Sequence, residues 1–92
     1  MRIDRFEDGD RCELRPRGEL RLGDARELFE RALAEDCSRV VLDFSGCEVE
    51  DRALSALADL LAEAQVRVAV RGLRHRQHRL LEYLGATQAA EP

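Results

Sequence analysis

The sequence predicts a small α/β domain with a mixed sheet of about four strands and three helices, in the order β-β-α-β-α-β-α. Three observations predict it. The first 20 residues read as two strands joined by a short turn, helical and strand patterns alternate after them, and 92 residues suffice for one domain with a modest core. Strand–helix–strand units of this size form right-handed parallel crossovers, whereas the first two strands pair as a hairpin or meander.

The first two strands are expected on either side of a turn. Residues 1–6 read as a short strand, and residues 7–10, Glu-Asp-Gly-Asp, form a strong turn signal. From Cys12 onward apolar residues alternate with charged ones, as in a half-buried strand. Pro16 predicts that this strand ends there or lies at a sheet edge, and residues 18–20 then leave the sheet.

A helix and a buried strand follow. Asp24 is the predicted N-cap, with Glu27 three residues on as a capping-box variant, and apolar residues at helical spacing continue to about Glu35. Residues 39–44 are a β-branched apolar run without alternation, which predicts a strand covered on both faces. Residues 45–50 are expected to form a loop.

The last three elements complete the pattern. A helix is predicted from Asp51, its N-cap, to about residue 65, because apolar residues recur along one face. Residues 66–70 alternate like a strand. A final helix is predicted over residues 74–84, with Gly85 placed as its C-cap.

Composition and charge exclude several classes of protein. The chain is 45% hydrophobic and 37% charged, and no run approaches the roughly 18 apolar residues of a membrane span. The first ten residues have no apolar signal-peptide core, so a cytoplasmic protein is expected. Residues 1–66 hold 10 arginines and 17 acidic residues (−7), whereas residues 67–92 hold 5 and 2 (+3). An acidic body with a basic last third does not predict nucleic-acid binding.

Enzymatic chemistry is not expected. The sequence has no Gly-rich phosphate loop, no cysteine–histidine metal spacing and no arrangement of nucleophile and base, so no cofactor or metal is predicted. Cys12 and Cys47 alternate with apolar neighbours, which favours the interpretation that they are small buried core residues and not reactive thiols. His75 and His78 lie three residues apart, but no carboxylate or cysteine cluster accompanies them.

Residues 40–57 read VVLDFSGCEVEDRALSAL. This segment resembles the signature of the STAS domain, the anti-sigma-factor antagonist fold: an apolar strand ending in aspartate, a short loop, then Asp-Ser-Ser-Gly opening a helix. Asp43 matches the strand-end aspartate and Asp51 the aspartate before the serines. Residues 18–20, 68–73 and 80–85 resemble further elements of the family. The resemblance spans about residues 10–85, the expected core. The length predicts one domain over residues 1–92, and the terminal residues 86–92 are expected to form a flexible tail.

The sequence departs from the family where regulated members are phosphorylated. The resemblance implies phosphorylation of the second serine, but Ala53 stands there, preceded by Arg52, and Ser55 lies inside the helix. Without that hydroxyl the domain is expected to bind its partner in a fixed state. Arg52 is then either a solvated charge or a fixed contact to an acidic partner. The expected partner-binding residues are Asp43, Asp51, Arg52, Ala53 and Ser55.

The resemblance implies a non-catalytic, protein-binding regulatory module. Its partner would be an anti-sigma kinase or a stress-signalling scaffold. Two alternatives stay open: a small STAS subunit that braces a lipid-transport ABC system, and a scaffold that self-assembles as a homodimer. A basic run near the C-terminus is either a solvated face or a docking patch for an acidic partner or anionic surface. It contains Arg74, His75, Arg76, His78 and Arg79.

Overall fold

A computed structural model of the chain describes residues 1–63 and 67–84, and these form a five-stranded mixed sheet with three helices. The α/β class and the order of the predicted elements are confirmed, with one additional short strand. The elements are β1 (Arg2–Asp8), β2 (Arg11–Leu20), α1 (Leu22–Leu33), β3 (Arg39–Asp43), β4 (Cys47–Val49), α2 (Asp51–Glu63), β5 (Val68–Arg71) and α3 (His75–Tyr83).

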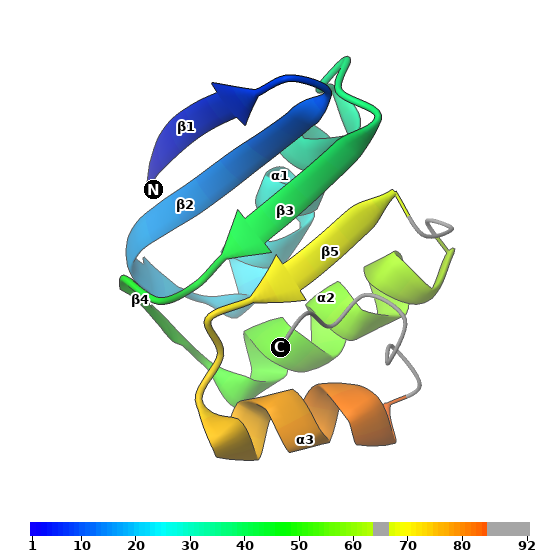
Figure 1. The fold of residues 1–92 in the computed structure, drawn as a ribbon. Coiled ribbons are helices and arrows are strands. Elements are labelled where there is room, and N and C mark those ends of the chain that lie inside the picture. Colours follow the sequence, from blue (N-terminus) through cyan, green and yellow to red (C-terminus); the bar gives the residue numbers. More distant parts are fainter. Residues whose placement is uncertain (64–66, 85–92) are drawn as a thin grey trace.

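The main sheet has the strand order β1-β2-β3-β5, and β4 pairs with the far end of β2. β1 and β2 are antiparallel, as expected of a hairpin, whereas β2, β3 and β5 run parallel. Figure 1 shows α1 and α2 behind the sheet and α3 beside α2 below β5. Because the parallel strands share one direction, their carboxyl ends and the loops that follow lie at one edge of the sheet.

One face of the sheet and the inner faces of α1 and α2 form the core. Alternate strand residues point into it, such as Leu14, Leu42 and Val70, and they meet helix residues such as Leu28 and Leu57. All five are essentially buried. This alternation is the pleat of each strand, in which successive side chains point to opposite faces.

The structure corrects the prediction for the second strand. β2 neither ends at Pro16 nor lies at an edge; it runs to Leu20, and Gly18 within it has a φ of 90°. The β2–β3 ladder stops at Leu14 and the β2–β4 ladder starts at Gly18. Pro16 therefore falls between the two parallel ladders, where its missing N–H interrupts neither, and it lies opposite Ile3 in the antiparallel β1–β2 ladder.

Two predicted helix starts are also corrected. α1 begins at Leu22, and Asp24 is its third residue, where the carboxylate accepts a hydrogen bond from the Arg21 backbone N–H at 3.0 Å. Asp51 is the first residue of α2, and the Glu50 carbonyl accepts the first helical hydrogen bond, from the Leu54 N–H at 2.9 Å. The predicted C-cap Gly85 and the tail over 86–92 lie outside the described residues.

Cys12 is fully buried, as predicted, but it is joined to Cys37 in a disulfide that the sequence analysis did not predict. Cys47 is a half-buried free thiol packed against the core. Within residues 1–63 and 67–84, no helix combines the length and the apolar character needed to cross a membrane.

Candidate functional site

The loops after β3 and β5 meet at the carboxyl edge of the sheet, the usual binding edge of open α/β sheets. They enclose a shallow depression of about 210 Å³. Its lining includes Ser45, Cys47, Val49, Gly72, Arg74 and Gln77. The two predicted aspartates, Asp43 and Asp51, flank this edge in the sequence, one before the loop and one after it.

Asp43 orders the first turn of this edge. The residue is only 6% exposed, and its carboxylate accepts hydrogen bonds from the Ser45 backbone N–H at 2.9 Å and the Ser45 hydroxyl at 2.6 Å. Arg71 Nε donates a third at 3.2 Å. Burial alone would raise the pKa of Asp43, but the bonds from Ser45 and Arg71 outweigh it and hold the pKa below the ordinary value. Asp43 is therefore an ionised loop-ordering acceptor.

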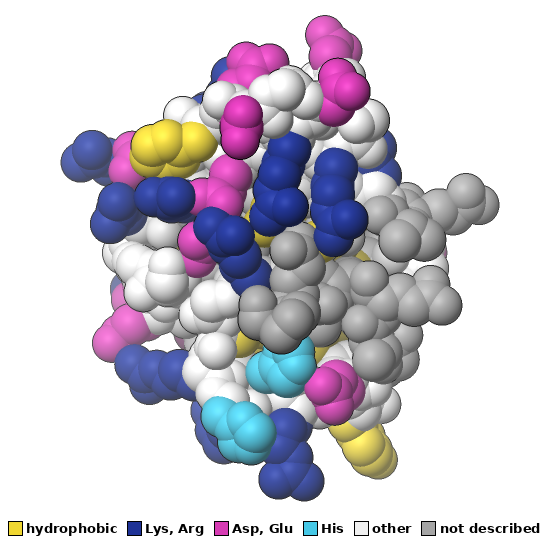
Figure 2. Space-filling view, in the orientation of Figure 1, with side chains coloured by type: hydrophobic (Ala, Val, Ile, Leu, Met, Phe, Trp, Pro, Cys, Tyr) yellow, Lys and Arg dark blue, Asp and Glu magenta, His cyan; other side chains and the backbone are white. Residues whose placement is uncertain are grey.

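The same carboxylate belongs to a charge network on the sheet face opposite α1 and α2. Arg71 and Arg15 both pair with Glu13, which is 9% exposed, and the Arg15 guanidinium lies 4.2 Å from the centre of the Phe6 ring. Figure 2 shows arginine and acidic side chains alternating over the strands on this face. These contacts join the four strands β1, β2, β3 and β5, which makes the network part of the scaffold.

Asp51 has different partners. Arg76, on α3, donates two hydrogen bonds to its carboxylate at 2.9 and 3.1 Å, and the Gln77 amide donates a third at 3.3 Å. These bonds, that of Arg76 above all, lower the pKa of Asp51. Gln77 is itself buried and also donates to the Val49 carbonyl. The first turn of α3 is therefore tied to the end of β4 and, through Asp51, to the first turn of α2.

The residues around the family's phosphorylation position are divided between core and surface. Ala53 is fully buried in the core cluster, Arg52 is exposed, and Ser55 is half-buried on the next turn. The predicted set of five therefore does not form one patch. Asp43 faces the charge network, Ala53 faces the core, and Asp51 and Arg52 lie at the exposed start of α2.

The basic run over residues 74–79 lies at the start of α3 and along it. Arg76 pairs with Asp51, Arg74 approaches Glu48 at 3.8 Å, and His78 pairs with Glu82 at 2.9 Å. Figure 2 shows both histidines, in cyan, with arginines beside them at the end of the face where α3 lies. A further depression of about 430 Å³ on this helix is lined by His75, Arg76, Arg79, Leu80 and Tyr83.

The sequence patterns did not predict the ion pair between Asp51 and Arg76 or the anchoring role of Gln77. One signal for Gln77 was present, because it lies four residues before Leu81 on the inward face of the helix, and these are the two buried residues of α3. No local signal pairs Asp51 with Arg76, since they are 25 residues apart and meet only when α2 and α3 pack.

The Asp43 contacts predict a loss of stability in acid. A carboxylate whose pKa is lowered by folding stabilises the protein above the unfolded pKa, here about 3.8, and this contribution is lost as the pH falls through the folded value. Urea unfolding between pH 3 and pH 7 should show D43N less stable than wild type at pH 7, with the difference shrinking below about pH 4.

The matched control is D59N, which removes an exposed carboxylate on α2 and should stay within about 0.5 kcal/mol of wild type throughout. A difference between D43N and wild type that does not change with pH would show that the ionisation of Asp43 does not contribute to stability.

Among the described residues, one group of three side chains could in principle hold a metal ion: Glu7, Cys12 and Cys37. It lies away from the carboxyl edge, near the amino ends of β2 and β3. The two sulfurs are bonded to each other in this structure, so one carboxylate is left as a ligand.

Comparison with known families identifies the fold. A family model described as "Mlab, STAS domain" matches residues 4–90, nearly the whole chain. A search of curated proteins found no match. The mixed sheet with helices on one face and the aspartate-led loop before α2 agree with this match. The chain therefore belongs to the STAS domain family, a family of regulatory protein-binding modules.

Proposed function

We propose that this protein is a non-catalytic STAS module that binds a protein partner constitutively, without a phosphorylation switch. The observation that carries the proposal is the environment of Ala53. Its side chain has no hydroxyl, and it is fully buried at the position where regulated relatives carry the phosphorylated serine. No hydroxyl there can accept a phosphoryl group, so the charge of roughly −1.5 to −2 that phosphorylation adds cannot be introduced at this position.

A fixed ion pair stands beside that position. The Asp51 carboxylate is held by two hydrogen bonds from Arg76, and both side chains are largely exposed. Arg52 is the next residue on α2, and Arg79 lies about one turn beyond Arg76 on α3. We call Asp51, Arg52, Arg76 and Arg79 the docking surface. Three arginines against one aspartate leave it positive, which fits an acidic surface on the partner.

The partner would be an anti-sigma kinase, a stress-signalling scaffold or a component of a lipid-transport ABC system, and binding would occur in the cytoplasm. Neighbouring genes separate these classes directly. Sigma-factor and kinase genes beside this gene support the first two, whereas permease and ATPase genes support the third. In all three cases the same docking surface makes the contact.

Self-assembly through the β1 edge of the sheet is the weaker alternative. β1 is an edge strand, and five of its seven residues are charged: Arg2, Asp4, Arg5, Glu7 and Asp8. Charged side chains along an edge disfavour pairing with a second copy. Sedimentation that gives only the 10.4 kDa species at high concentration would support this argument.

Charge reversal tests the docking surface. The partner is recovered from an extract of the source cells on the immobilised protein, identified by mass spectrometry and purified for titration. R52E combined with R79E should weaken binding at least about tenfold, because two attractive contacts become repulsive.

The control is R26E combined with R31E, which makes the same change in net charge on the exposed face of α1. It should bind like wild type. If both double variants bind equally well, or both are equally weakened, the docking surface is not the interface.

A further inference from the structure

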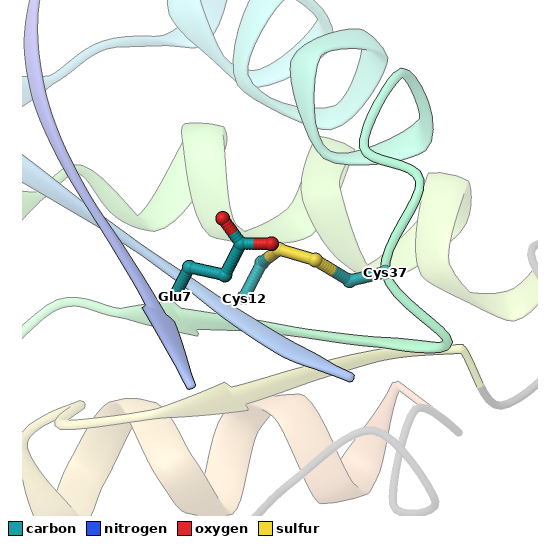
Figure 3. Close-up of side chains that lie close together, drawn as sticks. All are labelled: Glu7, Cys12 and Cys37. Atoms are coloured by element: carbon teal, nitrogen blue, oxygen red, sulfur yellow. A yellow bond between two sulfur atoms is a disulfide. The ribbon is translucent and has the colours of Figure 1, made fainter. Parts of the chain in front are cut away.

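The disulfide partners Cys12 and Cys37 lie far from the docking surface. Cys12 is near the start of β2, and Cys37 is in the connection between α1 and β3, so both are at the amino ends of the parallel strands. Their Cα atoms are 5.9 Å apart, within the range of about 4.4–6.8 Å that disulfides require. Figure 3 shows the two side chains pointing at each other, with Glu7 of β1 beside them.

Cys37 is the more accessible of the two cysteines. Cys12 is fully buried, whereas Cys37 is 8% exposed and lines a depression of about 320 Å³. Arg5, Glu7, Asp10 and Glu35 line the same depression. A small reagent can therefore approach Cys37 there, while Cys12 can react only with a group already attached to Cys37.

A guanidinium group is held against the inner sulfur. Arg5 Nη2 lies 3.4 Å from Cys12 Sγ. Glu35 accepts two hydrogen bonds from Arg5 Nε, each 2.8 Å long, and Glu7 accepts another from Nη1 at 3.3 Å. Glu35 and Glu7 offset the charge of Arg5, so its contribution is the N–H that it donates to Cys12 Sγ. A hydrogen bond donated to the sulfur favours the thiolate, which is the nucleophile in thiol–disulfide exchange.

We propose that Cys12 and Cys37 are a redox modification site whose oxidant is a small-molecule disulfide such as oxidised glutathione. In the reduced protein the Cys37 thiolate attacks one sulfur of the oxidant, forms a mixed disulfide and releases one small thiol. The Cys12 thiolate, favoured by Arg5, then attacks Cys37 Sγ and releases the second small thiol. The protein loses two electrons and two protons, and the oxidant is reduced to two thiols.

The bond acts on the stability of the fold and leaves the docking surface unchanged. It joins residues 25 apart in sequence, so it closes a loop that contains most of β2 and all of α1. Closing such a loop reduces the conformational freedom of the unfolded chain. The proposal does not depend on the partner, because the site and the docking surface lie at opposite edges of the sheet.

The experiment starts from the fully reduced, full-length protein treated with oxidised glutathione. Mass spectrometry should show the loss of two hydrogen atoms and one cross-linked peptide containing Cys12 and Cys37, and C47S should behave identically. The midpoint of thermal unfolding should be higher for the oxidised protein by about 10 °C or more. C12S should stop at the mixed disulfide on Cys37 and gain no such increase.

Arg5 provides a second readout. R5Q should close the disulfide about two- to fivefold more slowly, with the mixed disulfide accumulating, whereas R2Q on the same strand should match wild type. The proposal is overturned if wild type remains reduced or stops at the mixed disulfide. It is also overturned if zinc ion added to the reduced protein is retained by both thiols and blocks their oxidation.

Discussion

Replacing Gly72 by alanine is expected to lower the free energy of unfolding by about 3–5 kcal/mol, or to prevent folding. Gly72 has a φ of 80°, in the left-handed region that costs an L-residue about 1–2 kcal/mol. A Cβ there would also lie 2.5 Å from Asp43 Oδ1 and 2.6 Å from the Ser45 backbone nitrogen. The turn after β5 packs so closely on the turn after β3 that only glycine fits. Urea unfolding measures the loss.

Gly9 is the matched control for this prediction. It has a φ of 61°, but a Cβ there meets no atom within 4 Å. G9A should therefore cost only about 1–2 kcal/mol, the backbone cost without the clash. Equal losses for G9A and G72A would mean that the close contact between the two turns is unimportant.

Introducing a carboxylate at position 53 is expected to destabilise the fold by about 3 kcal/mol or more. Ala53 is fully buried and belongs to the core cluster, so A53D must enlarge a packed side chain and place a charge among apolar groups. This result would show that the site cannot carry a negative charge, as a phosphorylation switch requires. Urea unfolding of purified A53D at neutral pH gives the value.

R52D is the control because it places the same residue one position earlier, on the exposed side of the same helical turn. It should stay within about 0.5 kcal/mol of wild type, since acidic residues are favourable near a helix N-terminus. If A53D is as stable as R52D, position 53 does accommodate an anion, and the proposal of a fixed-state module loses its main support.

The elements that could be predicted from the sequence are those with a long local pattern. The apolar run around Val41 predicted β3, and the periodicity of α1 and α2 predicted both helices to within a few residues at each end. β4 was missed because a strand of three residues, Cys47–Val49, is too short to show alternation.

Features that depend on tertiary contacts could not be predicted from local sequence patterns. Pro16 normally marks the end or the edge of a strand, but here it occupies a gap between two ladders that only the folded sheet defines. Cys12 and Cys37 have no informative spacing, since their pairing follows from the return of the chain through α1 to the neighbouring strand. The N-cap of α1 was also predicted wrongly: it is Arg21, and the predicted Asp24 is the third residue of the helix.

The site was predictable in part. The position of Asp43 at the end of β3 and the loss of the serine at Ala53 could be read directly from the sequence. The burial of Ala53 and the division of the predicted residues between the charge network and the exposed start of α2 required the structure. The order of residues along the chain gives their neighbours in sequence, but it does not show which face of a helix or strand each one occupies.

The anchoring of α3 by Gln77 has a consequence for recognition. Only two side chains of this nine-residue helix are buried, Gln77 and Leu81, and an apolar contact such as that of Leu81 permits rotation about the helix axis. A hydrogen bond is directional, so the bond from Gln77 to the Val49 carbonyl sets the rotational angle of the helix. Every molecule then presents Arg76 and Arg79 at the same angle, and a rigid partner meets a surface whose geometry is already set.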